Sequence, residues 1–458
     1  MPNKNKSILS GNKINPSVFK SYDIRGIYPD DLNEETAYIA GQAYAKLTNV
    51  KKVVVGRDMR IGSPELSKKF IEGVTSQGAD VDDIGMVPID AVYFTAGYFK
   101  YDGGIMITAS HNPKEYNGIK MTTIDNGISM VRGKELYEYL ENKKFPVVDK
   151  QGTVKEIDTT EDYLKHVFSF INIDKIKPFK IVVDAGNGMA GKIMPLIFEK
   201  LPCELIPINF ELDGNFPAHP SNPLLEESQI GIKAKIKETG ADFGVILDGD
   251  TDRLFFVDEN SEFVPADTTL LVLAKHFLEK EPGSGIAYNA VCSKAVPTKI
   301  KEWGGIPIRT KVGFVNVAQG MKDEKGIMGG EVSAHYSFRD NFYADSGFIA
   351  FLTLLVLISN ENKKLSEIVG PLKPFSKADE VNIEVNNIDE VIKQVKEKYN
   401  DGKQDELDGV TIEYDSWWVN VRPSNTEPLL RITVEGNTEE ILEAKQSEVI
   451  DYIKSIAK

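Results

Sequence analysis

Short apolar runs alternate with amphipathic stretches over the first three quarters of the chain, a pattern that predicts alternating strands and helices. In the first helix of this kind, Ser63 is expected as the N-cap, Pro64 as the first helical residue and Gly78 as the end. The pattern restarts near residues 178 and 258, which indicates three similar mixed α/β units. The runs predicted as buried strands are residues 52–56, 104–108, 179–184 and 243–247.

The third unit and the last quarter differ in their pattern. The apolar run from Phe348 to Ile358 predicts a buried core helix, because it is shorter than the roughly 18 residues of a membrane span. After a linker at residues 371–374 the pattern becomes that of a small α+β domain, with strands between residues 381 and 435 and helices at 388–399 and 438–456. In the third unit we expect helices at 267–279 and from about 294, and strands at 285–288, 306–309 and 326–328. The domains expected are residues 15–150, 151–257, 258–372 and 373–458.

The composition disfavours a nucleic-acid-binding protein and a secreted, disulfide-bonded protein. The chain has 54 Lys and Arg against 69 Asp and Glu, so its net charge is −15, and no basic block favours a nucleic-acid partner. Two cysteines, Cys203 and Cys292, are far apart among apolar residues, which is typical of a reducing compartment. The first residues lack the apolar segment of a signal peptide. We therefore expect a cytoplasmic protein without a membrane or nucleic-acid partner, of undetermined oligomeric state.

A serine follows one of the predicted strands. Ser110 lies in Thr-Ala-Ser-His-Asn-Pro directly after the strand at 104–108, at the edge where open α/β sheets bind ligands. Such a serine is often only a turn residue. His111 beside it and Lys120 shortly after it offer the proton acceptor and the countercharge that a hydroxyl nucleophile needs. His111 could equally be a loop histidine bonded to backbone.

Three aspartates follow another predicted strand. Asp248, Asp250 and Asp252 alternate within five residues, and so many carboxylates repel one another unless a cation neutralises them. Oxygen ligands favour Mg²⁺ or Ca²⁺. An EF-hand would have Gly where Arg253 stands, and an aspartate-nucleophile phosphatase would have Thr where Asp252 stands. A metal site is therefore predicted, with Arg253 beside it to hold an anionic oxygen.

Two later loops and one early turn carry ligand-binding residue types. Glu331, Ser333 and His335 alternate, so extended backbone would turn all three toward one polyol, although an ordinary polar loop explains them equally well. Tyr22 and Arg25 could add another cationic contact near the N-terminus, although a surface turn explains them equally well. The last loop combines a guanidinium with hydroxyls and an amide, which suits a phosphate, and a tight turn with an exposed arginine is the alternative. Its residues are Arg422, Ser424, Asn425 and Thr426.

These motifs, in this order, resemble the α-D-phosphohexomutase family over residues 17 to 458. Thr-Ala-Ser-His-Asn-Pro followed by Asn-Gly-X-Lys, and Asp-Gly-Asp-X-Asp-Arg, carry the resemblance. It implies three similar α/β domains and a smaller C-terminal α+β domain around a central cleft. It also implies interconversion of hexose 1-phosphate and hexose 6-phosphate through a phosphoserine and a 1,6-bisphosphate. Mg²⁺ and glucose 1,6-bisphosphate, or an equivalent activator, are the implied cofactors.

The resemblance also assigns roles to residues. Ser110 would be the phosphoserine and, with the three aspartates, would hold Mg²⁺. His111 and Lys120 would assist proton transfer, Arg253 would neutralise charge, and Glu331 and Ser333 would read sugar hydroxyls. The remaining substrate contacts would come from Tyr22, Arg25, His335, Arg422, Ser424, Asn425 and Thr426.

The loop Gly-Glu-Val-Ser-Ala-His resembles the phosphomannomutase/phosphoglucomutase branch of that family. Phe314 stands where the family often has a sugar-contacting histidine, which bears on substrate preference. A phosphoglucosamine mutase and a non-catalytic sugar-phosphate binder are the alternatives.

Overall fold

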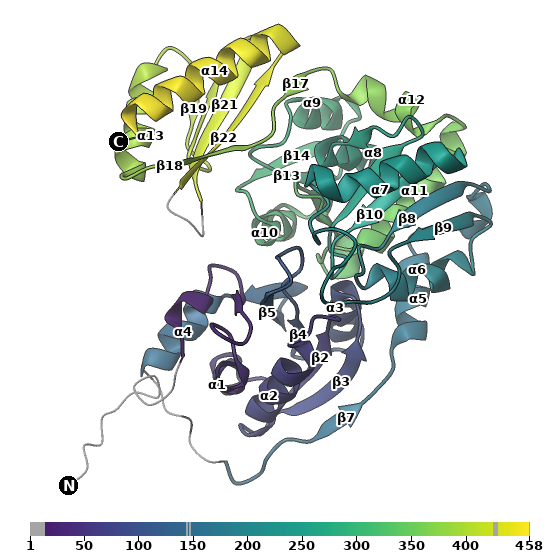
Figure 1. Cartoon of the computed structure of the whole chain (residues 1–458), viewed down its shortest axis with the longest axis vertical. Coiled ribbons are helices and arrows are strands. Elements are labelled where there is room, and N and C mark those ends of the chain that lie inside the picture. Colours follow the sequence, from purple (N-terminus) through teal and green to yellow (C-terminus); the bar gives the residue numbers. More distant parts are fainter. Residues whose placement is uncertain (1–13, 143–144, 146–147, 425–428, 458) are drawn as a thin grey trace. The chain divides into compact units, whose positions relative to one another are not determined.

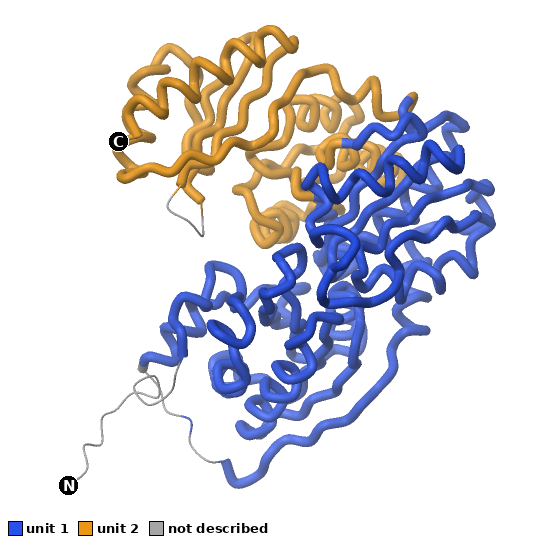
Figure 2. Tube along the Cα trace, in the orientation of Figure 1, with its two compact units in different colours: residues 1–264, 334–366 blue, residues 265–333, 367–458 orange. Residues whose placement is uncertain are grey.

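Strands and helices alternate from the N-terminal part of the chain onward, as the sequence predicts (Figure 1). The computed structural model describes residues 14–142, 145, 148–424 and 429–457. Two compact units are distinguished in Figure 2. Unit 1 contains residues 1–264 and 334–366, and unit 2 contains residues 265–333 and 367–458.

The first sheet of unit 1 is mixed, because parallel strands β4, β2, β3 and β7 continue into antiparallel β5 and β1. Its strands run in the order β1-β5-β4-β2-β3-β7, with β6 beside β5. The elements are η2 (Pro16–Val18), β1 (Ile24–Ile27), α1 (Glu34–Thr48), β2 (Lys52–Arg57), α2 (Ser63–Thr75), β3 (Asp80–Met86), α3 (Ile89–Tyr98), β4 (Gly103–Ile107), β5 (Tyr116–Ile124), β6 (Ile128–Val131), α4 (Gly133–Asn142) and β7 (Val154–Glu156).

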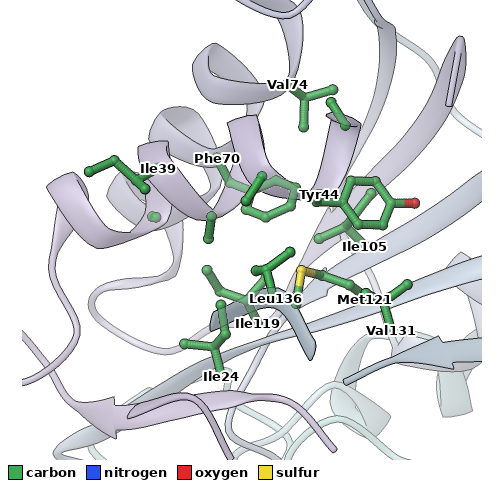
Figure 3. Close-up of a cluster of buried hydrophobic side chains, with 14 of the residues drawn as sticks. Ile24, Ile39, Tyr44, Phe70, Val74, Ile105, Ile119, Met121, Val131 and Leu136 are labelled. Atoms are coloured by element: carbon green, nitrogen blue, oxygen red, sulfur yellow. The ribbon is translucent and has the colours of Figure 1, made fainter. Parts of the chain in front are cut away.

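Apolar side chains from α1, α2 and α4 pack against one face of this sheet. Figure 3 shows Tyr44 and Phe70 of the helices beside Ile105, Ile119 and Met121 of the strands, all of them buried. Burying such side chains is the main driving force for the fold, at about 1.5–3 kcal/mol each. The packed layer fixes β4 and β5, whose connecting loop carries Ser110.

Helix α2 differs from the prediction at both ends. Its N-cap is Gly62, and Ser63 is already helical because its hydroxyl donates to Asp58 Oδ1 at 2.6 Å instead of capping the helix. The helix ends at Thr75, and Gly78 lies beyond it at a φ of 91°. The strand predictions in this region are confirmed.

The second sheet of unit 1 has parallel β9, β8 and β10, followed by antiparallel β11 and β12. Its order is β12-β11-β10-β8-β9. The turn between β10 and β11 carries the three aspartates predicted as metal ligands, so buried strands hold both of its ends. The elements are α5 (Thr160–Phe168), η3 (Ile173–Lys175), β8 (Lys180–Asp184), α6 (Ala190–Phe198), β9 (Glu204–Ile208), α7 (Glu226–Thr239), β10 (Phe243–Leu247), β11 (Leu254–Asp258) and β12 (Phe263–Val264).

Residues 334–366 return to unit 1 and complete its core. They include β16 (Tyr336–Phe338), η4 (Arg339–Asn341) and α11 (Gly347–Glu361). Every residue of α11 from Gly347 to Ser359 is buried, and the Phe351 ring stacks on Phe198 at 5.8 Å between centroids. A helix that is apolar on all sides is a core helix, so this prediction is confirmed. Within the described residues, no helix is long and apolar enough to span a membrane.

Unit 2 begins with α8 and three parallel strands in the order β14-β13-β15. The sequence analysis predicted these strands but not α10, which lies between β14 and β15. The elements are α8 (Ala266–Lys280), β13 (Gly285–Asn289), α9 (Ala295–Glu302), β14 (Ile306–Thr310), α10 (Phe314–Glu324) and β15 (Gly326–Gly330). A short connection of α12 (Leu365–Val369) and η5 (Gly370–Leu372) leads to the last sheet.

The C-terminal sheet is antiparallel, in the order β17-β22-β21-β20-β19, with β18 also paired to β22. Helices α13 and α14 bury Val395 and Val449 in its core with Val419 of β21. The elements are β17 (Ser376–Lys377), β18 (Val381–Glu384), α13 (Ile388–Lys398), β19 (Lys403–Asp405), β20 (Val410–Glu413), β21 (Trp417–Pro423), β22 (Leu429–Gly436) and α14 (Glu439–Ile456). The predicted series of α/β domains followed by an α+β domain is therefore confirmed, while the predicted domain boundaries stay a prediction.

Candidate active site

Ser110 lies in the serine loop (residues 108–115) between β4 and β5. Its backbone is left-handed, with a φ of 50°, and its side chain is buried. The Thr108 hydroxyl accepts from the Ser110 N–H at 2.9 Å, which fixes this uncommon turn. The Ser110 hydroxyl donates to Asp248 Oδ2 at 2.7 Å. The structure therefore brings together the serine and the first aspartate that the sequence singled out.

Asp248, Asp250 and Asp252 form the aspartate cluster in the β10–β11 turn. Carboxylate oxygens of all three lie within 4.8 Å of one another, and all three side chains are buried. Burial and the charges of Asp252 and Asp250 hold the pKa of Asp248 well above its usual range. Asp250 Oδ1 is buried and accepts no hydrogen bond from the described residues. These donors fit a hard divalent cation such as Mg²⁺, which takes oxygen ligands.

Two cations accompany the cluster. Lys120 of β5 is buried, and its Nζ donates to Asp252 Oδ2 at 2.7 Å and to Asp250 Oδ2 at 3.0 Å. Burial alone would lower the pKa of Lys120, but the two carboxylates outweigh it and raise that pKa well above the usual value. The Arg253 backbone N–H donates to Asp248 Oδ1 at 3.2 Å, and its Nε lies 3.9 Å from Asp248 Oδ2. The site thus holds a lysine that stays charged at neutral pH.

His111 lies against the serine hydroxyl, with Nδ1 3.3 Å from Ser110 Oγ. Burial lowers the pKa of His111 well below its usual value, and the nearby charges of Arg253 and Arg25 add to this effect. The imidazole is therefore neutral at physiological pH. A neutral imidazole can accept a proton, so its state fits the expected role.

His335 lies with the aspartate cluster in unit 1. Its Nε2 is 3.3 Å from Asp252 Oδ1 and 3.9 Å from Asp345 Oδ2. The sequence argument assumed extended backbone from Glu331 to His335, and this is wrong. Ala334 has a φ of 65° after a turn at residues 332–333, so the alternation of side chains is lost.

Asp345 is a neighbour of the site that the sequence argument missed. Burial raises the pKa of Asp345 to about 7; the His335 ring opposes this shift and Asp252 adds to it. Asp345 lies in no recognisable motif. It lies near His335 because residues 334–366 pack in unit 1. Asp252, His335 and Asp345 also place three ligand atoms within 4.8 Å of one another.

Glu331 and Ser333 lie in unit 2 after β15. Glu331 is buried, and its Oε1 accepts from Asn289 Nδ2 at 3.1 Å and from the Gly313 N–H at 2.9 Å. Ser333 Oγ donates to Glu331 Oε2 at 3.1 Å. The carboxylate is thus held beside Phe314, the first residue of α10.

The residues predicted to bind phosphate in the C-terminal domain lie at the end of β21, with Arg422 in the strand and Ser424 directly after it. Arg422 is buried and donates to Glu380 Oε2 at 2.7 Å, and Arg431 donates to the other oxygen of the same carboxylate at 3.0 Å. The Ser424 N–H donates to the Leu429 carbonyl at 2.9 Å. Two other predicted members of the loop, Asn425 and Thr426, lie outside the described residues. Glu380 was missed, because nothing in its sequence neighbourhood pairs it with an arginine.

Arg25 of β1 joins the serine loop. Its guanidinium donates to Asn112 Oδ1 at 2.6 Å and pairs with Asp23. Tyr22 lies in the bend that precedes β1. The N-terminal turn is therefore held against the loop that carries Ser110.

Profiles of one protein family match four consecutive parts of this chain. They are described as phosphoglucomutase/phosphomannomutase, with α/β/α domain I at residues 16–146, α/β/α domain II at 161–261, α/β/α domain III at 265–375 and the C-terminal domain at 380–451. Together they cover most of the sequence and include every candidate residue described above.

Two sequence relatives and one solved structure carry names of the same family as the profiles. The chain is 35% identical over 448 residues to a protein of Xanthomonas campestris named phosphohexose mutases, covering 95% of this chain and 99% of that protein. It is 36% identical to the phosphomannomutase of Escherichia coli K12, and the match covers 92% of this chain and 95% of that protein. A crystal structure of a phosphoglucomutase/phosphomannomutase family protein from Burkholderia thailandensis superposes with a TM-score of 0.87 at 29% identity, over 96% of this chain and 98% of that one. The chain belongs to the phosphoglucomutase/phosphomannomutase family of phosphohexomutases.

Proposed function

We propose that this protein interconverts hexose 1-phosphate and hexose 6-phosphate, with Ser110 as the residue that carries the phosphoryl group. One observation carries the proposal: the buried Ser110 hydroxyl donates to Asp248 at 2.7 Å inside a cluster of three carboxylates. A serine that served only as a turn residue would not need this cluster. The names of the relatives point to the same class of reaction.

The reaction proceeds in two balanced transfers. Phosphorylated Ser110 gives its phosphoryl group to the free hydroxyl of a hexose monophosphate. A base takes the proton of that hydroxyl, and the Ser110 oxygen takes up a proton as its bond to phosphorus breaks, so Ser110 is left as an alcohol. The product is a hexose 1,6-bisphosphate. After this intermediate has turned end for end, the Ser110 hydroxyl gives its proton to a base and attacks the other phosphorus. The bond between that phosphorus and the sugar oxygen breaks, the sugar oxygen takes up a proton, and Ser110 is phosphorylated again. Free glucose 1,6-bisphosphate would restore the phosphoserine whenever the intermediate escapes.

The residues around Ser110 have the charge states that these steps need. His111 is neutral and lies 3.3 Å from the hydroxyl, so it can take the proton. Lys120 and Arg253 offset the negative charge that spreads over the transferring group. Asp248, Asp250 and Asp252, with the phosphate on Ser110, would hold Mg²⁺, which neutralises phosphoryl oxygens when bound.

The remaining residues predicted from the sequence would contact the substrate. We assign sugar hydroxyls to Glu331 and Ser333, and the contacts near the reacting end to His335, since it lies with the aspartate cluster. Tyr22 and Arg25 would add contacts beside the serine loop. The non-reacting phosphate would be held by Arg422, Ser424, Asn425 and Thr426.

Mannose and glucose phosphates are the proposed substrates. The loop Gly-Glu-Val-Ser-Ala-His and the phosphomannomutase name of a relative favour them over glucosamine phosphates. Phe314 replaces a polar ring with an apolar one next to Glu331, so we expect weaker discrimination between sugars that differ at one hydroxyl.

The test combines an assay with a mass measurement. Protein incubated with mannose 1-phosphate, Mg²⁺ and a trace of glucose 1,6-bisphosphate should yield mannose 6-phosphate. Intact mass should show one phosphate that Ser110→Ala removes together with the activity. Failure to interconvert any of mannose, glucose or glucosamine phosphates would overturn the proposal. Release of inorganic phosphate instead of an isomer would indicate a phosphatase.

A further inference from the structure

Arg60 is a fully buried arginine whose bonds converge on the serine loop. It lies between β2 and α2, with 1% of its surface exposed. Its guanidinium donates four hydrogen bonds, and every acceptor is a backbone carbonyl. The acceptors are Ser110 at 2.7 Å, Asn112 at 2.7 Å, Pro113 at 2.8 Å and Tyr116 at 2.9 Å.

Of these four carbonyls, that of Ser110 is buried, and an unpaired buried carbonyl is costly. A guanidinium offers five N–H groups in one plane, and no other side chain can serve four such acceptors at once. The charge of Arg60 is balanced by buried Asp58, whose Oδ2 lies 3.4 Å from Nε. Its flat face packs on the Phe216 ring, 4.8 Å from the centroid. Asp58 and Phe216 thus fix the position of the Arg60 guanidinium, and its N–H donors restrain the backbone of the serine loop.

The Ser110 carbonyl is fixed from a second side as well. Ser221 Oγ donates to it at 3.2 Å. A Cβ atom at Gly249 would lie only 2.9 Å from the same oxygen, so the aspartate turn approaches the loop closely. This carbonyl belongs to the residue with the left-handed backbone, so its hydrogen bonds restrain the backbone from which the Ser110 hydroxyl extends.

We propose that Arg60 is the positioning residue that orients the Ser110 hydroxyl toward the aspartate cluster for phosphoryl transfer. The inference rests on the proposed role of Ser110. Arg60 acts through the backbone of the loop, so its loss should lower kcat and leave the KM for the sugar phosphate nearly unchanged. A misplacement of about 1 Å costs on the order of 100-fold in rate, which sets the expected loss of kcat.

The experiment compares four variants of the full-length protein with the wild type. Arg60→Lys keeps the charge but cannot serve four acceptors, and Arg60→Ala opens a cavity that guanidinium ion can enter. The double variant Asp58→Asn/Arg60→Met removes both buried charges, so that the Asp58 carboxylate is not left without its Arg60 countercharge. Arg57→Met is the matched control, because Arg57 ends β2 and its side chain donates a long hydrogen bond, of 3.5 Å, to the Asp58 carbonyl.

The measurements are kcat and KM with mannose 1-phosphate, and the rate at which glucose 1,6-bisphosphate phosphorylates Ser110, followed by intact mass. Folding is checked by thermal unfolding. We expect both rates to fall about 100-fold in the Arg60 variants, with saturable recovery of Arg60→Ala by guanidinium chloride and no loss in Arg57→Met.

Folded Arg60 variants with the kcat of the wild type would overturn the inference, and so would a loss confined to KM. Unfolding of all the Arg60 variants would assign this residue to stability alone and overturn it too. If the wild type neither interconverts hexose phosphates nor carries a phosphate on Ser110, the proposed function itself has failed, whatever the variants do.

Discussion

Replacing Lys120 with methionine removes the cation from the aspartate cluster while keeping a long unbranched side chain. Lys120 is 4% exposed and donates to Asp252 at 2.7 Å and to Asp250 at 3.0 Å. Its loss leaves three buried carboxylates without their closest countercharge. The variant tests whether the cluster is built to hold positive charge.

The expected cost is that of breaking a buried ion pair, about 3–5 kcal/mol of unfolding free energy. Mg²⁺ should recover part of it, since a ligand present at 100 times its Kd stabilises by about 2.7 kcal/mol. The variant should also bind the metal more tightly than the wild type, because Lys120 no longer competes for Asp250 and Asp252. The mutase activity should still fall by about 100- to 1,000-fold, because the Lys120 ammonium no longer offsets the negative charge of the phosphoryl group during transfer.

Urea unfolding in EDTA and in Mg²⁺ measures both effects. Lys52→Met is the matched control, because Lys52 pairs with Asp82 at 2.7 Å but is 50% exposed. Such a surface pair is worth about 0–1 kcal/mol. If Lys120→Met costs no more than Lys52→Met in EDTA, or if Mg²⁺ stabilises the variant no more than the wild type, the electrostatic reasoning is refuted.

Two further changes test other parts of the structure. Burial raises the pKa of Asp90 to about 7, so the folded protein keeps a proton that the unfolded chain has lost above about pH 4. Stability should therefore fall between pH 4 and pH 7 by about 4 kcal/mol at most, and Asp90→Asn should flatten this part of the profile in urea unfolding; an unchanged slope would contradict the assignment. Gly249→Ala should place a methyl group against the Ser110 carbonyl and lower kcat by about 100-fold. Gly231→Ala, on the open face of α7, should instead keep full activity and raise the free energy of unfolding by about 0.5–1 kcal/mol. Equal kcat values in the two alanine variants would contradict the predicted steric clash at Gly249.

The chemistry of the site could be predicted where residues follow buried strands. Ser110 and Asp248 each come directly after an apolar run, and such runs are strong local signals. Carboxyl ends of parallel strands gather ligand-binding residues, so both could be singled out from the sequence, and the structure places them within hydrogen-bond distance. The three alternating aspartates also follow a buried strand, and the structure places their carboxylate oxygens within 4.8 Å of one another.

Other parts of the site depend on contacts that leave no local pattern. Arg60 serves backbone carbonyls, which every residue type has, so nothing in the sequence marks its partners. Asp345 joins His335 only because residues 334–366 pack in unit 1. The expected common face of Glu331 and His335 was lost through one positive φ at Ala334, a non-glycine residue at which such a backbone is uncommon.

The path of the chain also limits how this protein can be cut or recombined. A fragment that stopped at Val264 would lack α11, whose buried side chains fill the interior of unit 1, and would lack His335 beside Asp252. Exchanging residues 265–375, the stretch matched by the third family profile, with those of a relative would replace both the core helix α11 and the histidine beside Asp252 in one step. Chimaeras intended to change sugar preference should therefore exchange residues 265–333 alone, which leaves the interior of unit 1 native.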